Sequence, residues 1–154
     1  MLKDQKAAIC AEWLHGLADW GVVMTLTFKK YPYSDLPRST IAIKKTMRFL
    51  ITRLNKQAFG HRAQRQQYRI ASAFVIECGP DGHHGHAHAT LSIPVRYTTE
   101  EFSIIVNNLI KKFMTIDTQV DIQPYRNSGW HAYCLKHGVE NLVAEDITEA
   151  HPKG

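Results

Sequence analysis

The most regular pattern along the chain is an alternation of apolar and polar residues between positions 86 and 93. The apolar positions of this stretch are Ala87, Ala89, Leu91 and Ile93. Successive side chains leave a strand on opposite faces, so a period of two predicts a half-buried strand. Its apolar residues should face a core. His86 and His88 should project together from the other face, about 6.5 Å apart along the strand.

Similar patterns predict the first half of the chain. A helix over 4–18 should bury one stripe of apolar residues, Ile9, Trp13, Leu14 and Leu17. A strand over 22–29 should point Met24, Leu26 and Phe28 to one face and Thr25, Thr27 and Lys29 to the other. A helix capped by Ser39 or Thr40 and ending near residue 57 has the core stripe Ile43, Met47, Leu50 and Leu54.

The second half begins with a strand over 68–78, mostly apolar at its centre, and a turn at 79–82 that pairs it with the histidine strand as a hairpin. Thr98 or Thr99 opens a helix with the apolar stripe Phe102, Ile105, Leu109 and Phe113. Residues 120–124 predict a short edge strand, because Pro124 lacks a donor. Ser128 is expected to cap a last helix that ends at Gly138, and the acidic stretch 139–154 is expected to fray.

This order of elements predicts an α+β fold, a ferredoxin/RRM-like sandwich. It should have a central antiparallel sheet of about four to five strands and helices packed mainly on one face. The length of 154 residues corresponds to a single domain, and neither repeats nor a second domain are apparent. Three cysteines lie far apart in no CxxC pattern, which argues against a disulfide framework or a cysteine zinc site. Without an apparent signal peptide or long apolar run, we expect a cytoplasmic protein.

The net charge of +5 is unevenly distributed. Residues 29–69 hold eleven basic side chains and a single acidic one, Asp35. Such a run is typical either of a solvated helix face or of a surface that binds a polyanion. The charge run alone does not decide between the two.

Glu77 joins the two histidines as a candidate metal ligand. It lies near the end of the strand that should pair with the histidine strand, on the same face as Ala71, Ala73 and Val75. A carboxylate and two imidazoles leave open positions on an ion, and such mixed ligation accepts Mg²⁺ or Mn²⁺. His83 and His84, in the turn, are expected to be bystanders or substrate contacts.

Tyr133 and Lys136 are the second chemical signal. They lie three residues apart on the last predicted helix and therefore share a face. A tyrosine hydroxyl has a reference pKa of about 10, so as a nucleophile it needs a nearby cation. Viewed in isolation, the same pair is more typical of a packed aromatic residue beside an exposed lysine.

Together these motifs resemble the HUH endonucleases, specifically the single-tyrosine rolling-circle replication initiators (Rep proteins). Met24 to Phe28 is similar to the family's first motif, His86-Ala87-His88 to its histidine–hydrophobic–histidine motif, and Tyr133-Cys134-Leu135-Lys136 to its Tyr-x-x-Lys motif. Glu77 matches the acidic residue that such proteins place just before the histidine strand. The motifs occur in the Rep order over residues 20–138, and the domain is expected to span 1–154.

The resemblance implies metal-dependent nicking and rejoining of single-stranded DNA through a 5′-phosphotyrosine. Tyr133 and Lys136 would be catalytic, and Glu77, His86 and His88 would hold Mn²⁺ or Mg²⁺. DNA contacts are expected from Thr25, Thr27, Lys29, Lys44, Lys45 and Arg48. Expected partners are single-stranded DNA at an origin or hairpin and the host replication machinery of a plasmid, phage or related element. No membrane is expected, and the chain should be a monomer or weak dimer.

Several features of the sequence exclude particular branches of this family and related enzymes. No Walker A signature is present, so a helicase domain is not expected, and no second tyrosine lies one helical turn from Tyr133. A tyrosine that follows the histidines argues against conjugative relaxases. Two-histidine phosphoesterases need two His-x-Thr elements, and only His88 begins one. Single-tyrosine transposases, and a non-catalytic ferredoxin-like nucleic-acid-binding module, stay open as alternatives.

Overall fold

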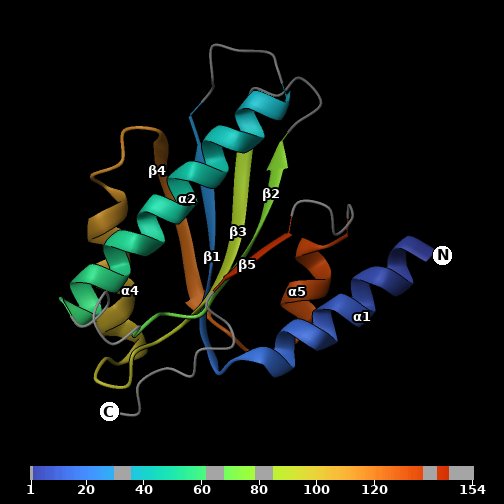
Figure 1. Ribbon diagram of the computed structural model, residues 1–154, viewed down its shortest axis with the longest axis horizontal. Helices are drawn as coiled ribbons and strands as arrows, with labels where there is room; N and C mark the ends of the chain where they lie inside the picture. The colour runs from blue at the N-terminus through green and yellow to red at the C-terminus, as the bar shows by residue number, and fades with distance from the viewer. Residues whose placement is uncertain (1, 30–35, 62–67, 79–84, 137–141, 146–154) are drawn as a thin grey trace.

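The computed structural model describes residues 2–29, 36–61, 68–78, 85–136 and 142–145 (Figure 1). The helices in these ranges are α1 (Leu2–Leu17), α2 (Leu36–Phe59), α4 (Thr99–Ile110) and α5 (Gly129–Cys134). The strands are β1 (Trp20–Phe28), β2 (Ser72–Cys78), β3 (Gly85–Ser92), β4 (Ile116–Pro124) and β5 (Leu142–Glu145). None of the described helices is long and apolar enough to cross a membrane.

The five strands form one sheet in the order β4-β1-β3-β2-β5, and every neighbouring pair is antiparallel. The succession β1-α2-β2-β3-α4-β4 with this strand order is a ferredoxin-like sandwich, to which β5 adds an edge strand beside β2. The predicted fold class is therefore confirmed. β5 was not expected, because residues 142–145 lie in the stretch predicted to fray; their pairing with β2 decides their conformation.

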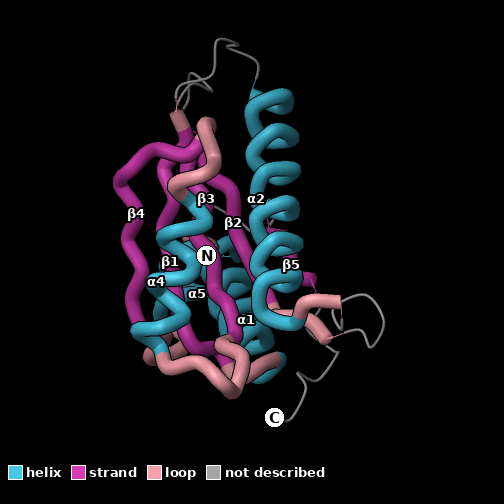
Figure 2. Tube along the Cα trace, turned by 90° about the vertical axis from the view of Figure 1, so that its left-hand side faces the viewer, coloured by secondary structure: helices cyan, strands magenta, loops and turns pink. Residues whose placement is uncertain are grey.

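One face of the sheet packs against α2 and α4 and holds the larger core. The alternation predicted for β1 and β3 is confirmed, because Met24, Leu26 and Phe28 lie in this core together with Ala87, Ala89 and Leu91. The predicted stripe of α2 is also confirmed, since Ile43, Met47, Leu50 and Leu54 are all fully buried. α2 runs alongside the strands over much of their length (Figure 2).

The opposite face of the sheet packs against α1 and α5, which lie together in Figure 1. Here the predicted stripe of α1 is wrong in two positions, because Ile9 is 71% exposed and Trp13 is 54% exposed. The buried positions of α1 are mainly Ala7, Ala11 and Leu14. Small side chains let α1 pack closely on α5, the element that it mainly contacts, while Leu14 reaches Ala73 and Val75 of the sheet across a small cavity.

Local chemistry explains several element boundaries. Thr98 caps α4 with a complete capping box, because its hydroxyl accepts from the Glu101 backbone N–H and the Glu101 carboxylate accepts from the Thr98 N–H. Gly21 sits where the pairing of β1 with β3 shifts register, and a Cβ there would come within 2.3 Å of Ile93. Glycine has no Cβ and therefore leaves room for the Ile93 side chain at this position.

Candidate active site

The register of β1, β3 and β2 aligns polar side chains in two rows on the α1/α5 side of the sheet. Thr27, His86 and Glu77 are paired across the three strands. In the next row Thr25 pairs with His88, and His88 with Val75. Directly paired residues project from the same face. The predicted convergence of Glu77 with the histidines on one face therefore follows from the observed pairing.

His88 and Glu77 are in direct contact. The His88 Nε2 and the Glu77 Oε2 lie 3.2 Å apart, and the His88 side chain is only 8% exposed. Burial lowers the pKa of His88 below its ordinary value of 6.5, while the hydrogen bond and charge of Glu77 partly oppose this shift. His88 is therefore held as a neutral imidazole near neutral pH, the form that binds a cation.

Each histidine ring is oriented by a threonine of β1. The Thr25 Oγ1 lies 3.1 Å from the His88 Nδ1, and the Thr27 Oγ1 lies 3.2 Å from the His86 Nδ1. In neutral His88 the hydrogen bond to Glu77 places the proton on Nε2, so Nδ1 accepts from the Thr25 hydroxyl; binding of an ion at Nε2 would require the other tautomer, in which Nδ1 donates to the threonine oxygen. These contacts give the threonines a positioning role. Their predicted contact with DNA stays a prediction.

α5 places Tyr133 next to this cluster. The ring of Tyr133 lies 6.1 Å from that of His88, and the Trp130 ring lies 5.9 Å from His88 and 6.2 Å from Tyr133. The Lys136 Nζ is 4.0 Å from the centroid of the Tyr133 ring. α5 ends at Cys134, so Lys136 lies in the turn after the helix, and not on the helix as predicted. Tyr133 is 53% exposed. A half-open tyrosine therefore lies between an ammonium group and the histidine–glutamate pair.

The other described tyrosines are engaged elsewhere. The Tyr125 hydroxyl lies 2.7 Å from the His15 Nδ1, and burial followed by the charge of Glu12 raises its pKa above 10. Tyr97 accepts from Arg96 through its hydroxyl, and Tyr68 packs on Phe59. Tyr31 and Tyr33 lie outside the described residues. Of the described tyrosines, Tyr133 is the one that lies next to both His88 of β3 and Lys136.

The start of α5 differs from the prediction. Ser128 has a helical conformation and makes no cap; its hydroxyl donates instead to the Glu12 carboxylate of α1 at 2.7 Å. Asn127 takes the capping role, because its side-chain oxygen accepts from the Gly129 N–H. Ser128 thus ties α5 to α1, and Asn127 begins the helix.

His131 is a site residue that the sequence did not reveal. It is 3% exposed, and its Nε2 lies 3.0 Å from the Thr90 hydroxyl, two residues along β3 from His88. Its ring also packs on Trp20 and Tyr125. Burial, followed by the charge of His15, lowers its pKa from 6.5 to about 4. His131 therefore anchors the tyrosine helix to the histidine strand as a neutral ring.

A small cavity separates α5 from the sheet, with both His88 and His131 in its wall. Its volume of about 10 Å³ is at the lower limit for a single water. Cys134 also lines it, and burial raises the pKa of this thiol to about 12. Cys134 is accordingly a packing residue, not a competing nucleophile.

The sheet floor beyond the histidines is polar as well. Asp121 of β4 pairs with Thr25, and the Gln123 amide donates to both Asp121 carboxylate oxygens at 3.1 and 3.2 Å. The exposed Asp121 carboxylate therefore shares the face of the sheet with Glu77. The alternation of Val120, Asp121 and Ile122 was a usable signal for it.

The predicted DNA contacts divide between the two sides of the sheet. Lys29 follows β1 and is exposed. Lys44, Lys45 and Arg48 belong to α2, which covers the face opposite to His86 and His88. Because Ile43, Met47 and Leu50 pack against the sheet, the basic side chains of α2 lie across the sheet from Tyr133. Binding of nucleic acid elsewhere by these side chains stays a prediction.

The donor set is compatible with a divalent ion. Two ligands held about 2.0–2.3 Å from one ion lie roughly 3.0–3.5 Å from each other, and the His88 Nε2 and Glu77 Oε2 are 3.2 Å apart. Across the described part of the chain, no three His, Cys, Asp or Glu side chains are already gathered around a single point. The spacing of His88 and Glu77 therefore suits two ligands of one ion, with His86 paired to Glu77 across the strands, and metal binding by the three stays a prediction. His83 and His84 lie outside the described residues.

Comparison with known proteins identified no matching family model, curated protein or solved structure.

Proposed function

We propose that this chain is a metal-dependent, single-tyrosine nickase and ligase of single-stranded DNA. The observation that carries the proposal is that α5 and the turn after it bring Tyr133 and Lys136 next to the His88–Glu77 pair of β3 and β2. The order of the motifs resembles the Rep branch of the HUH endonucleases. Initiation of rolling-circle replication of a mobile element in the cytoplasm belongs to the same proposal.

Tyr133 is the proposed nucleophile. Its phenolic oxygen attacks the scissile phosphorus, and the bond from that phosphorus to the 3′ oxygen of the preceding nucleotide breaks. The products are a 5′-phosphotyrosine and a free 3′-hydroxyl, which host polymerases can extend. The reverse attack by a 3′-hydroxyl rejoins the strand and releases Tyr133. Because one phosphoester replaces another, no external energy source is required.

Lys136 and the histidines support this step in different ways. The Lys136 ammonium, 4.0 Å from the centroid of the Tyr133 ring, would attract the phosphate that Tyr133 attacks. Thr25 and Thr27 fix the two imidazoles, and His131 fixes α5 against β3. Glu77, His86 and His88 would hold Mn²⁺ or Mg²⁺, which polarises the phosphate and offsets its developing negative charge.

The proposal is tested by mixing the protein with a pool of single-stranded oligonucleotides, some containing hairpins, and Mn²⁺. A covalent adduct should appear on a denaturing gel and should disappear when the metal is chelated. Tyr133→Phe keeps the ring and its packing but removes the attacking oxygen, so it should bind DNA and form no adduct. Tyr68→Phe, remote from the site, is the matched control and should form it normally.

Two results would favour the alternatives. A stable, intertwined dimer in light scattering, together with adduct formation, would favour a single-tyrosine transposase. DNA binding that is insensitive to metal, without any adduct from the pool, would favour a non-catalytic binding module.

A further inference from the structure

The outer face of α2 carries a concentration of positive charge. Residues 36–59 include six basic side chains and no acidic one. Lys45, Arg48, Arg53 and Lys56 are exposed, and Lys44 is half-buried. We call Lys45, Arg48, Phe49, Arg53 and Lys56 the α2 basic face.

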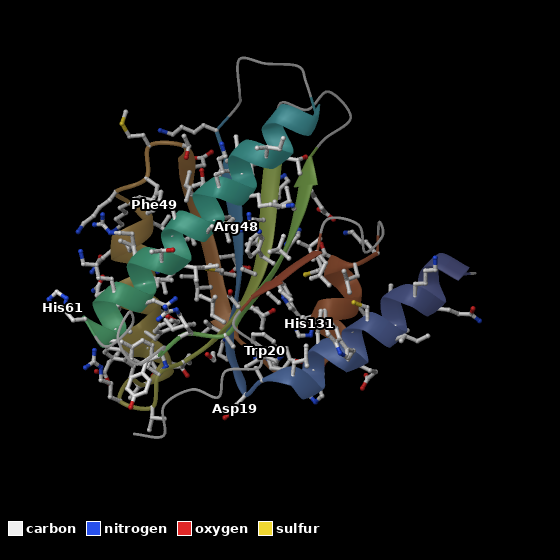
Figure 3. All side chains as sticks on the ribbon, in the orientation of Figure 1. Asp19, Trp20, Arg48, Phe49, His61 and His131 are labelled. Atoms are coloured by element: carbon white, nitrogen blue, oxygen red, sulfur yellow. The ribbon has the colours of Figure 1, made fainter. Side chains whose placement is uncertain are left out.

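Phe49 lies within this face and is 55% exposed. Its ring packs edge-on against Phe113, just after α4, with a centroid distance of 5.8 Å. This contact places the exposed Lys111 and Lys112 of α4's end beside the middle of α2. The Arg53 guanidinium also lies 5.9 Å from the Phe49 ring. Figure 3 labels Arg48 and Phe49 on α2 and, well away from them, His131 beside α5 and α1.

The site across the sheet has the opposite electrostatic character. Glu77 and Asp121 bring two carboxylates onto its floor, and carboxylates repel phosphates. The sheet face beneath Tyr133 therefore adds little to the affinity for a polyanion beyond the ammonium group of Lys136. The positive charge needed for affinity is concentrated on the other side of the molecule.

A phosphate backbone fits the α2 basic face better than a lipid surface or an apolar protein partner does. A basic amphipathic helix binds membranes by inserting its apolar face. The apolar face of α2 is already in the core, through Ile43, Met47, Leu50 and Leu54. From Lys45 to Lys56 the helix rises about 16 Å, a distance spanned by roughly five phosphates along one strand of duplex DNA.

We propose that the α2 basic face is a second nucleic-acid surface, which holds double-stranded DNA by its phosphates and without reading its sequence. The duplex beside the nick, or the stem of a hairpin, would bind here while the single strand passes over the histidine face. The identity of the partner as DNA rests on the proposed function. The charge distribution that creates the surface does not.

The test measures binding of a 20-base-pair duplex of arbitrary sequence by fluorescence anisotropy, without divalent metal and over a series of salt concentrations. The triple variant Lys45→Gln, Arg53→Gln, Lys56→Gln removes three charges from exposed positions. We expect its duplex affinity to fall at least about tenfold at moderate salt, and the slope of log K against log salt to decrease by up to about 2.7.

A charge-retaining triple variant, Lys45→Arg, Arg53→Lys, Lys56→Arg, is the matched control and should bind as the parent does. Thermal unfolding checks that both variants are folded. Unchanged duplex affinity and salt slope in the glutamine variant would overturn the inference. So would a preference for anionic lipid vesicles over duplex at the same salt concentration.

The inference and the proposed function fail separately. Loss of duplex binding in the glutamine variant upholds the surface even when no protein forms an adduct with single-stranded DNA. Normal adduct formation together with unchanged duplex binding overturns the surface and leaves the nickase standing. Tyr133→Phe should bind the duplex as the parent does.

Discussion

The two faces of the sheet are built from the same three central strands but from different kinds of residue. On the α2/α4 side the strands contribute large apolar side chains such as Phe28, Phe74 and Leu91. On the α1/α5 side they contribute alanines together with threonines, histidines and a glutamate. Because side chains alternate, a strand such as β3 stabilises the fold with one set of residues and presents chemistry with the other.

The two cores hold their helices in place in different ways. The large core fills the space between the sheet and α2 with shape-complementary side chains. The small one positions α5 through a few directed contacts, chiefly His131 with Thr90 and Ser128 with Glu12. We therefore expect substitutions on the two sides to separate stability from activity.

The largest separation is expected for the histidines. His86→Ala together with His88→Ala should lower the rate of adduct formation by about a hundredfold or more, because the metal site and the support of Tyr133 are both lost. Affinity for DNA should change little, since it comes mainly from charge elsewhere. Adduct yield and anisotropy on the same oligonucleotide check this. Equal losses of DNA affinity and of adduct formation would contradict the assignment of binding and chemistry to opposite faces of the sheet.

The next effect concerns the two cores. Leu50→Ala, in the large core, should lower the free energy of unfolding by about 2–5 kcal/mol. Leu14→Ala, in the small core, should loosen mainly α1 and α5 and should reduce adduct formation under conditions where the sheet remains folded. Urea unfolding and amide hydrogen exchange separate the two. Similar loss of protection in all strands for both variants would contradict this picture.

The threonines of β1 should have a smaller effect. Thr25→Val and Thr27→Val remove the partners of the histidine Nδ1 atoms, and we expect each to weaken metal binding and adduct formation by about 10–100-fold. Titration with Mn²⁺ measures the first effect. Unchanged metal affinity with weakened binding of single-stranded DNA would instead support the direct DNA contact predicted from the sequence.

The mildest test is a pH titration of the His131 anchor. The pKa of His131 is lowered from 6.5 to about 4, so the unfolded chain binds a proton that the folded chain rejects. The stability due to this group is complete above pH 6.5 and is lost progressively as the pH falls toward 4. His131→Gln, which keeps a donor and an acceptor near Thr90, should flatten this part of the stability profile. An unchanged profile would show that the ring is not the group responsible.

The same comparison explains how far the sequence could predict the structure. On the side of α2 and α4, the positions selected by the strand or helix period also hold the most hydrophobic residues. The sequence pattern therefore predicted β1, β3 and the buried stripe of α2 directly. On α1 they conflict: Ile9 and Trp13 are the more hydrophobic residues, but Ala7 and Ala11 are the buried ones, on a helix that packs mainly against α5. The helical period does not show which side of α1 meets α5.

The candidate site shows a similar limit. Glu77, His86 and His88 could be placed on one face by counting, since alternation and one turn determine it. His131 could not, because its role depends on β3 and α5 meeting in space. The alternation around Asp121 predicts its face of β4, but its place beside Thr25 depends on the pairing of β1 with β4. The sequence also did not show which face of the sheet α2 covers, and therefore did not show that Lys44, Lys45 and Arg48 lie across the sheet from Tyr133.

The proposed nicking takes place on the sheet face that holds His86 and His88, with Tyr133 as the nucleophile. The most direct measurement is peptide mapping, by mass spectrometry, of the adduct formed with single-stranded DNA and Mn²⁺, after nuclease and protease digestion. We predict a nucleotide 5′-phosphate on the peptide containing Tyr133, and an intact 3′-hydroxyl on the released strand. A modification on Tyr125 or any other residue, or the absence of an adduct across the oligonucleotide pool, would contradict it.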